Sequence, residues 1–96
     1  MEIAMTLRKG FAKALRIVRK HKNLTQEDFS EVSSRTYLST LERGMKSPTL
    51  DKVEDLASVL GIHPATLLLL AYSKSEKIAI EQLCDQVILE AKSFDS

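Results

Sequence analysis

The chain has 96 residues, with 14 Lys and Arg, 13 Asp and Glu, and one cysteine. This length suits one domain with a modest core, a lone cysteine cannot form an internal disulfide, and no apolar run approaches the roughly 18 residues of a membrane span. No signal-peptide pattern opens the chain, so we expect a cytoplasmic protein. Residues 1–48 hold ten Lys and Arg against five Asp and Glu, whereas residues 49–96 hold four against eight. The basic N-terminal half favours an anionic partner.

The first two predicted elements are helices, because apolar residues recur at helical spacing. Thr6 should cap a first helix that stops at Asn23. Its inward stripe should comprise Leu7, Phe11, Ala14, Leu15 and Val18. Thr25 should then cap a second, short helix from Gln26 to about Val32.

The third predicted helix lies in the segment SSRTYLSTLERG, after Ser33 or Ser34 and before Gly44. At about 100° per residue, five donor side chains fall within an arc of roughly 140° that holds no carboxylate. They are Arg35, Thr36, Ser39, Thr40 and Arg43. A solvated helix face usually mixes both signs of charge, so a face of donors alone favours a polyanion.

Three more helices follow. Thr49 should cap a fourth helix that ends at Gly61, with an inward side of Leu50, Val53, Leu56, Ala57 and Leu60. Pro64 should start a fifth helix, PATLLLLA, capped by His63. The capping-box spacing of Ser73–Glu76 predicts the start of a sixth helix. Its apolar stripe comprises Ile80, Leu83, Cys84, Val87, Ala91 and Phe94.

The segments LRIVRKHKNLTQEDF, SRTYLSTLERG and SPTLDKVEDLASVLGIHPATLL together resemble the helix-turn-helix domain of XRE or Cro-like repressors of bacteria and phages. The resemblance covers about residues 7–70. It implies an all-α, lambda-repressor-like bundle of five helices, followed here by a C-terminal helix over residues 73–94. Between TQE and LERG the chain is two residues shorter than the family pattern and has no glycine. The second helix or its turn should therefore be shortened.

The resemblance also implies that the third helix enters the major groove of DNA, while the start of the second helix meets the phosphate backbone. The DNA-binding residues that we predict are Thr25, Gln26, Ser34, Arg35, Thr36, Tyr37, Ser39, Thr40, Arg43 and Lys46. Arg35 has the chemistry to donate two parallel hydrogen bonds to guanine. Tyr37 has two open roles: core packing alone, or a buried ring whose hydroxyl contacts a phosphate.

The resemblance further implies a partly buried ion pair between Arg19 and Glu42. A carboxylate facing DNA would repel phosphate, so Glu42 should turn inward. We interpret the basic outer face of the first helix as solvated. His21 and His63 have no ligating neighbours, so we expect no metal, and Cys84 is typical of a small buried residue rather than a nucleophile. The sequence has no Gly-rich phosphate loop, nucleophile elbow or paired-carboxylate motif, so we expect no cofactor and no enzymatic activity.

Apolar residues beyond the predicted DNA-binding bundle favour a homodimer in which the C-terminal helix packs on its twofold mate. We predict an interface of Leu69, Tyr72, Ile80, Leu83, Cys84, Val87 and Phe94. The alternative is that this helix folds back on its own domain. The sequence thus predicts a homodimeric, sequence-specific double-stranded DNA-binding transcription regulator, a repressor of a palindromic operator. Alternatives are an antitoxin or other module whose C-terminal helix binds a partner protein, and a restriction-modification controller.

Overall fold

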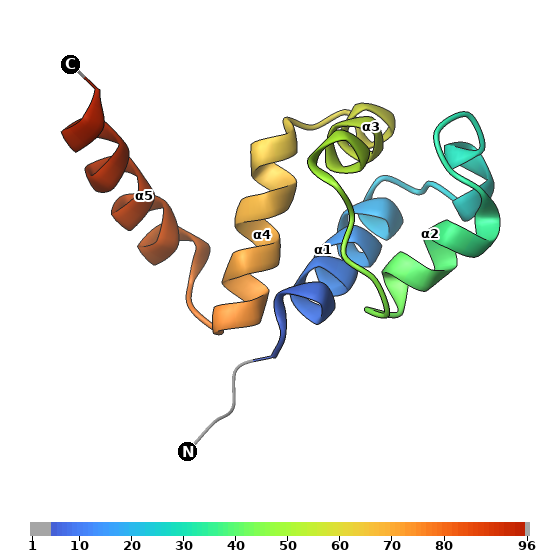
Figure 1. The fold of residues 1–96 in the computed structure, drawn as a ribbon, viewed down its shortest axis with the longest axis horizontal. Coiled ribbons are helices and arrows are strands. Elements are labelled where there is room, and N and C mark those ends of the chain that lie inside the picture. Colours follow the sequence, from blue (N-terminus) through green and yellow to red (C-terminus); the bar gives the residue numbers. More distant parts are fainter. Residues whose placement is uncertain (1–4, 96) are drawn as a thin grey trace.

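The computed structural model describes residues 5–95 (Figure 1). In chain order these residues form α1 (Leu7–His21), the 3-10 helix η1 (Gln26–Phe29), α2 (Arg35–Glu42), α3 (Leu50–Leu60), α4 (Pro64–Glu76) and α5 (Ile80–Phe94). This part of the chain contains no strand, which confirms the all-α prediction. No single helix within it is long and apolar enough to cross a bilayer.

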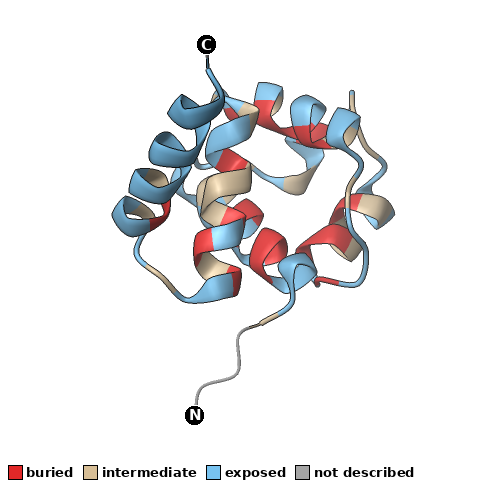
Figure 2. Ribbon diagram, turned by 60° about the vertical axis from the view of Figure 1, so that its left-hand side comes forward, coloured by how far each residue is buried: buried red, intermediate tan, exposed pale blue. Residues whose placement is uncertain are grey.

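The core lies among the elements from α1 to α4. Its side chains with no exposed surface are Leu15, Phe29, Leu41, Leu56 and Leu67, with Ala57 and Ala71 beside them. Figure 2 shows these elements with buried inward sides, whereas α5 is exposed along almost its whole length. A five-element bundle with an outlying C-terminal helix therefore matches the expected architecture.

The predicted caps are present. The hydroxyls of Thr6, Ser34 and Thr49 accept hydrogen bonds from backbone N–H groups three residues later, at 3.3, 3.1 and 3.1 Å. His63 Nδ1 accepts from the N–H of Ala65 at 2.9 Å. Left-handed backbone, with φ of 58° or 71°, occurs at the three predicted stops: Asn23, Gly44 and Gly61. These local signals fix where the helices begin and end.

The predicted helix from Gln26 to Val32 is too long. The observed element, η1, ends at Phe29 and is a 3-10 helix. The N–H groups of Val32 and Ser33 both donate to the carbonyl of Phe29, at 3.0 and 2.9 Å. The short connection forces the chain to turn there, because Ser34 must already be extended to cap α2.

Two apolar side chains predicted to face the core are exposed instead. Leu50 is 77% exposed and Leu7 is 41% exposed. Each is the first residue of its helix. Side chains on a helix lean toward its N-terminus, so these two project past the edge of the core.

The prediction that Ser73–Glu76 starts the last helix is wrong. α4 continues through this segment to Glu76, and α5 begins at Ile80. The Ser73 hydroxyl donates to the carbonyl of Ile78 at 2.6 Å, and the Ser75 hydroxyl donates to the carbonyl of Met5 at 2.8 Å. Both serines are buried and hold α4 to neighbouring backbone, rather than capping a new helix.

α1 and α4 form the largest helix–helix contact of the described chain, and they cross closely at Gly10. A Cβ added there would lie 2.5 Å from the carbonyl oxygen of Ala71 and 2.8 Å from Cβ of Ser75. The missing side chain lets the two backbones touch. Sequence reasoning did not single out this glycine, because nothing local distinguishes it from one that merely weakens a helix.

A buried ion pair fixes α2 against α1. Arg19 Nε donates to Glu42 Oε2 at 2.6 Å and Nη2 donates to Oε1 at 2.9 Å, while Nη1 donates to the carbonyl of Leu24 at 3.0 Å. The amide of Gln26 donates to Glu42 Oε1 at 3.2 Å. Glu42 is 4% exposed, so its charge depends on these partners.

The hydrogen bonds to Glu42 raise the pKa of Arg19 above its ordinary value; burial opposes this rise and charge attraction adds to it. A raised pKa means that the folded protein favours the charged form of Arg19. The contribution of this charge to folding stability is lost only as the pH rises through that pKa. The guanidinium therefore stays charged at every pH of biochemical interest.

We expect Gly10→Ala to destabilise the protein by about 1–3 kcal/mol, because the new methyl group overlaps the backbone of α4. In an open helix the same change would stabilise by about 1 kcal/mol, so the sign is diagnostic. Urea unfolding measures the difference. Lys13→Ala, an exposed change on the same helix, should lie within about 0.5 kcal/mol of the wild type. A Gly10→Ala protein as stable as the wild type would contradict the close crossing.

We expect Arg19→Met alone to cost about 3–5 kcal/mol of unfolding free energy, because Glu42 would remain buried without its cation. Combining it with Glu42→Gln, which keeps an acceptor oxygen for Gln26, should recover part of that loss. Urea unfolding at fixed protein concentration is the measurement. Arg16→Met, on the exposed side of α1, is the matched control. A double variant less stable than Arg19→Met would show that the buried charge is not the source of the cost.

Candidate nucleic-acid interface

α2 follows η1 across a tight turn, and together they form the helix-turn-helix unit. Leu38, Leu41 and Glu42 are buried, so this side of α2 faces the bundle. α2 lies at the end of the molecule opposite α5 (Figure 1). The remaining side of α2 faces outward.

The outward side of α2 carries the predicted donors. Arg35, Thr36 and Arg43 are exposed, while Ser39 and Thr40 are partly buried. In the described chain Arg35 has no hydrogen-bond or ion-pair partner, so its guanidinium has all its donors available. The Thr40 hydroxyl donates to the carbonyl of Thr36 at 2.8 Å, which leaves its methyl group and oxygen lone pairs to offer a ligand.

The residues predicted to clamp phosphate are held in place by neighbouring groups. The N–H and hydroxyl of Thr25 donate to Asp28 Oδ2, at 2.7 and 3.1 Å. Gln26 donates to Glu42, and the Ser34 oxygen accepts from the N–H of Tyr37. Thr25 and Gln26 stand at the start of η1, and Lys46 is exposed in the loop after α2. Gln26, Ser34 and Lys46 keep hydrogen-bond donors for a phosphate, whereas both donors of Thr25 are turned to Asp28.

Tyr37 packs partly against the core, as both of the roles left open by the sequence require. Its ring centroid lies 5.8 Å from Nζ of Lys52 on α3. Lys52 also donates to the carbonyl of Val32 in the turn before α2. Sequence reasoning missed Lys52, because its partners are 15 and 20 residues away and no local motif links them.

The C-terminal residues line a separate apolar groove of about 380 Å³ between α4 and α5. Its walls are Ala65, Leu68, Leu69, Tyr72, Leu83 and Val87. Leu83 is 7% exposed, so the start of α5 does pack on α4; Phe94, at the far end of α5, is 87% exposed. The other predicted interface residues, Ile80 and Cys84, are partly buried.

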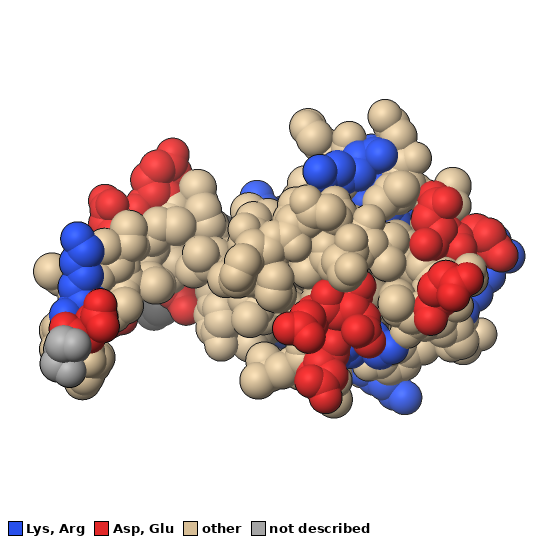
Figure 3. Space-filling model, turned by 90° about the horizontal axis from the view of Figure 1, so that it is seen from above, with Lys and Arg blue, Asp and Glu red and all other residues tan. Residues whose placement is uncertain are grey.

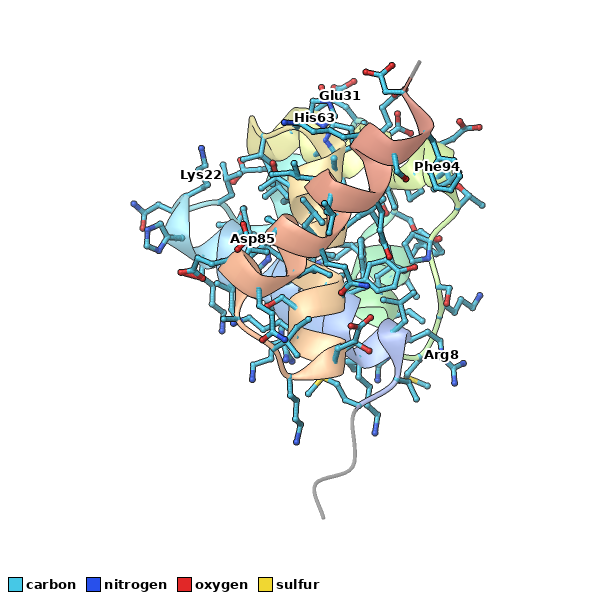
Figure 4. All side chains as sticks on the ribbon, turned by 90° about the vertical axis from the view of Figure 1, so that its left-hand side faces the viewer. Arg8, Lys22, Glu31, His63, Asp85 and Phe94 are labelled. Carbon is cyan, nitrogen blue, oxygen red and sulfur yellow. The ribbon has the colours of Figure 1, made fainter. Side chains whose placement is uncertain are left out.

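An uncharged band separates the charged side chains of α5 from those of the main body. Figure 3 shows carboxylates on α5 at one end of the molecule and a band of uncharged side chains between them and the charged groups of the main body. Figure 4 shows Asp85 and Phe94 on opposite sides of α5. α5 is therefore amphipathic, with a charged side and an apolar side.

Among residues 5–95, no three His, Cys, Asp or Glu side chains lie together as a metal site would require.

Comparison with known proteins places this geometry in a family. A family model described as helix-turn-helix matches residues 15–67. An uncharacterized HTH-type transcriptional regulator, y4dJ of Sinorhizobium fredii, is 38% identical over 66 residues, which cover 67% of this chain and 86% of that protein. Control protein C.BamHI of Bacillus amyloliquefaciens is 38% identical over 61 residues, 60% of this chain and 75% of that protein.

Solved structures agree. The clp gene regulator ClgR of Corynebacterium glutamicum superposes with a TM-score of 0.70 at 30% identity, over 78% of this chain and 99% of that one. A hypothetical transcription factor, NHTF of Neisseria, gives a TM-score of 0.61 at 30% identity, over 71% and 83% of the two chains. The chain belongs to the XRE-type helix-turn-helix family of DNA-binding transcription regulators.

Proposed function

We propose that this protein is a homodimeric repressor that binds a palindromic operator in double-stranded DNA. The observation that carries the proposal is the outward side of α2, where exposed Arg35, Thr36 and Arg43 lie on a helix face without a carboxylate. Glu42, the carboxylate of this helix, is buried and paired. Such a positively charged surface is attracted by the negative potential of a DNA groove, and its donors can form hydrogen bonds with base edges.

In this proposal the N-terminal half of α2 enters the major groove. Arg35 donates two hydrogen bonds to guanine O6 and N7, and Thr36 and Thr40 contact base edges, including thymine methyl groups. Further contacts to phosphate set the register of the helix without reading sequence. They come from Gln26, Ser34, Ser39, Tyr37, Arg43 and Lys46, and from Thr25 once its hydroxyl turns from Asp28 to the phosphate.

A second copy of the chain is the partner that we propose for the apolar groove between α4 and α5. The apolar stripe of α5 continues past the groove through Val87 to Phe94, which is 87% exposed, and has no partner there within the described chain. In a twofold pair, each α5 would cover the other's stripe. Because α2 lies at the opposite end of the molecule, both recognition helices would stay free for half-sites about 34–36 Å apart.

The likeness to control protein C.BamHI favours the controller alternative over the antitoxin alternative. A controller would use the same interface and differ in the genes that it regulates. Co-purification of a second, different chain at a fixed ratio would instead favour an antitoxin whose C-terminal helix binds its partner.

We expect substitutions of two side chains of the interface to impair DNA binding in different ways. On a duplex selected from a random pool, Arg35→Ala should lose preference at one base pair of each half-site. Lys46→Ala should weaken selected and random duplexes alike and reduce the slope of log affinity against log salt by about one unit for each phosphate that it no longer neutralises. Titrations at several salt concentrations measure both. If the wild type itself shows no preference at about 0.15 M salt, the proposal of specific binding fails.

We expect Val87→Lys to separate the dimer, because it places a charge inside the apolar groove. Sedimentation should then show a monomer, and operator affinity should fall by about a hundredfold, since two linked half-sites become independent. Leu89→Lys is the matched control: Leu89 is 74% exposed and lies about 200° around α5 from Val87. A Val87→Lys dimer that binds normally would exclude this surface as the interface.

A further inference from the structure

We propose that Lys52, on α3, is a positioning residue that sets the direction of α2 and thereby the base preference of Arg35. This inference rests on the proposed function of α2 as the recognition helix. It concerns the turn of residues 30–34, which joins η1 to α2 and contains no glycine.

One ammonium group joins three elements at this turn. Lys52 Nζ donates a hydrogen bond to the carbonyl of Val32, in the turn. It lies 5.8 Å from the ring centroid of Tyr37, in the first turn of α2. Its third neighbour is Asp55, on its own helix, at 3.9 Å. The Lys52 side chain is 24% exposed, so it is held inside the fold rather than extended into solvent.

The first two contacts carry the restraint. A hydrogen bond from a charged donor is stronger than one between neutral groups, and a cation within about 6 Å of an aromatic ring is attracted to its face. The pair with Asp55 is weak, because the distance is long and the Asp55 side chain is 50% exposed. Lys52 therefore acts on the turn and on α2 more than on its own helix.

The backbone of the turn is held from two sides. The N–H groups of Val32 and Ser33 donate to Phe29 at the end of η1, while the carbonyl of Val32 accepts from Lys52. Two residues later, Ser34 caps α2, and Arg35 is the first residue of that helix. A shift of the Val32 carbonyl is thus passed to Arg35 through a very short stretch of chain.

α2 has one polar anchor at each end. Its C-terminal end is fixed to α1 by the Glu42–Arg19 pair, and its N-terminal end is fixed to α3 by Lys52. A helix of eight residues is about 12 Å long. If the N-terminal anchor is removed, a tilt of about 10° about the other end moves Arg35 by roughly 2 Å, which is enough to break hydrogen bonds to a base edge.

The test compares Lys52→Met with the wild type. Methionine keeps an apolar stem against Tyr37 but removes the donor and the charge. Lys13→Met, at an exposed lysine of α1, is the matched control for the loss of one positive charge. Each protein is used to select duplexes from a random pool, and each is then titrated against the wild-type operator and a random duplex at the same salt concentration.

We expect Lys52→Met to lower the ratio of operator to random affinity by roughly tenfold, the discrimination that one well-placed base contact supplies. Its selected sequences should lose or change preference at the base pair that Arg35→Ala also affects. Lys13→Met should weaken both duplexes equally and keep the wild-type preference. A general loss of stability cannot change base preference in this way, provided that binding is measured where circular dichroism shows both proteins folded.

A Lys52→Met protein that is folded and selects the wild-type operator at an unchanged affinity ratio would overturn the inference. So would a loss of preference spread evenly over the operator, away from the base pair that depends on Arg35. These results differ from failure of the proposed function, in which the wild type itself would select no sequence.

Discussion

The ion pair between Arg19 and Glu42 is the contact on which the DNA-binding side of this protein depends. Glu42 belongs to α2, and an outward carboxylate there would repel phosphate. Burying it is costly unless its charge is fully paired, and Arg19, with help from Gln26, supplies that pairing. One interaction therefore joins α1, η1 and α2, and it also leaves the outward side of α2 without negative charge.

Much of this architecture follows from local sequence. Side-chain caps at Thr6, Ser34 and Thr49 mark helix starts, because each hydroxyl satisfies a backbone donor that the helix leaves free. Left-handed residues such as Asn23 and Gly61 mark helix ends. The donor side of α2 could also be predicted from local sequence, because the period of a helix determines which of its side chains lie on the same side.

The features that could not be predicted are those that depend on distant partners. Ser75 lies within a segment spaced like a capping box, but it bonds to the carbonyl of Met5, 70 residues away. Leu50 fits the apolar period of α3, yet it lies beyond the edge of the core. Lys52 and Gly10 gain their roles from a turn and a helix crossing that exist only once the chain has folded. A pattern within one helix carries no information about what packs against it.

The most direct test of α2 as the recognition helix is to map which residues touch DNA. Backbone amide signals of the labelled protein would be followed by NMR as duplex DNA is added. We expect the largest shifts at the outward side of α2, from Arg35 to Arg43, and at the start of η1, with small effects along α5. Shifts centred on α5, or an α2 that is unaffected while DNA binds, would contradict this role.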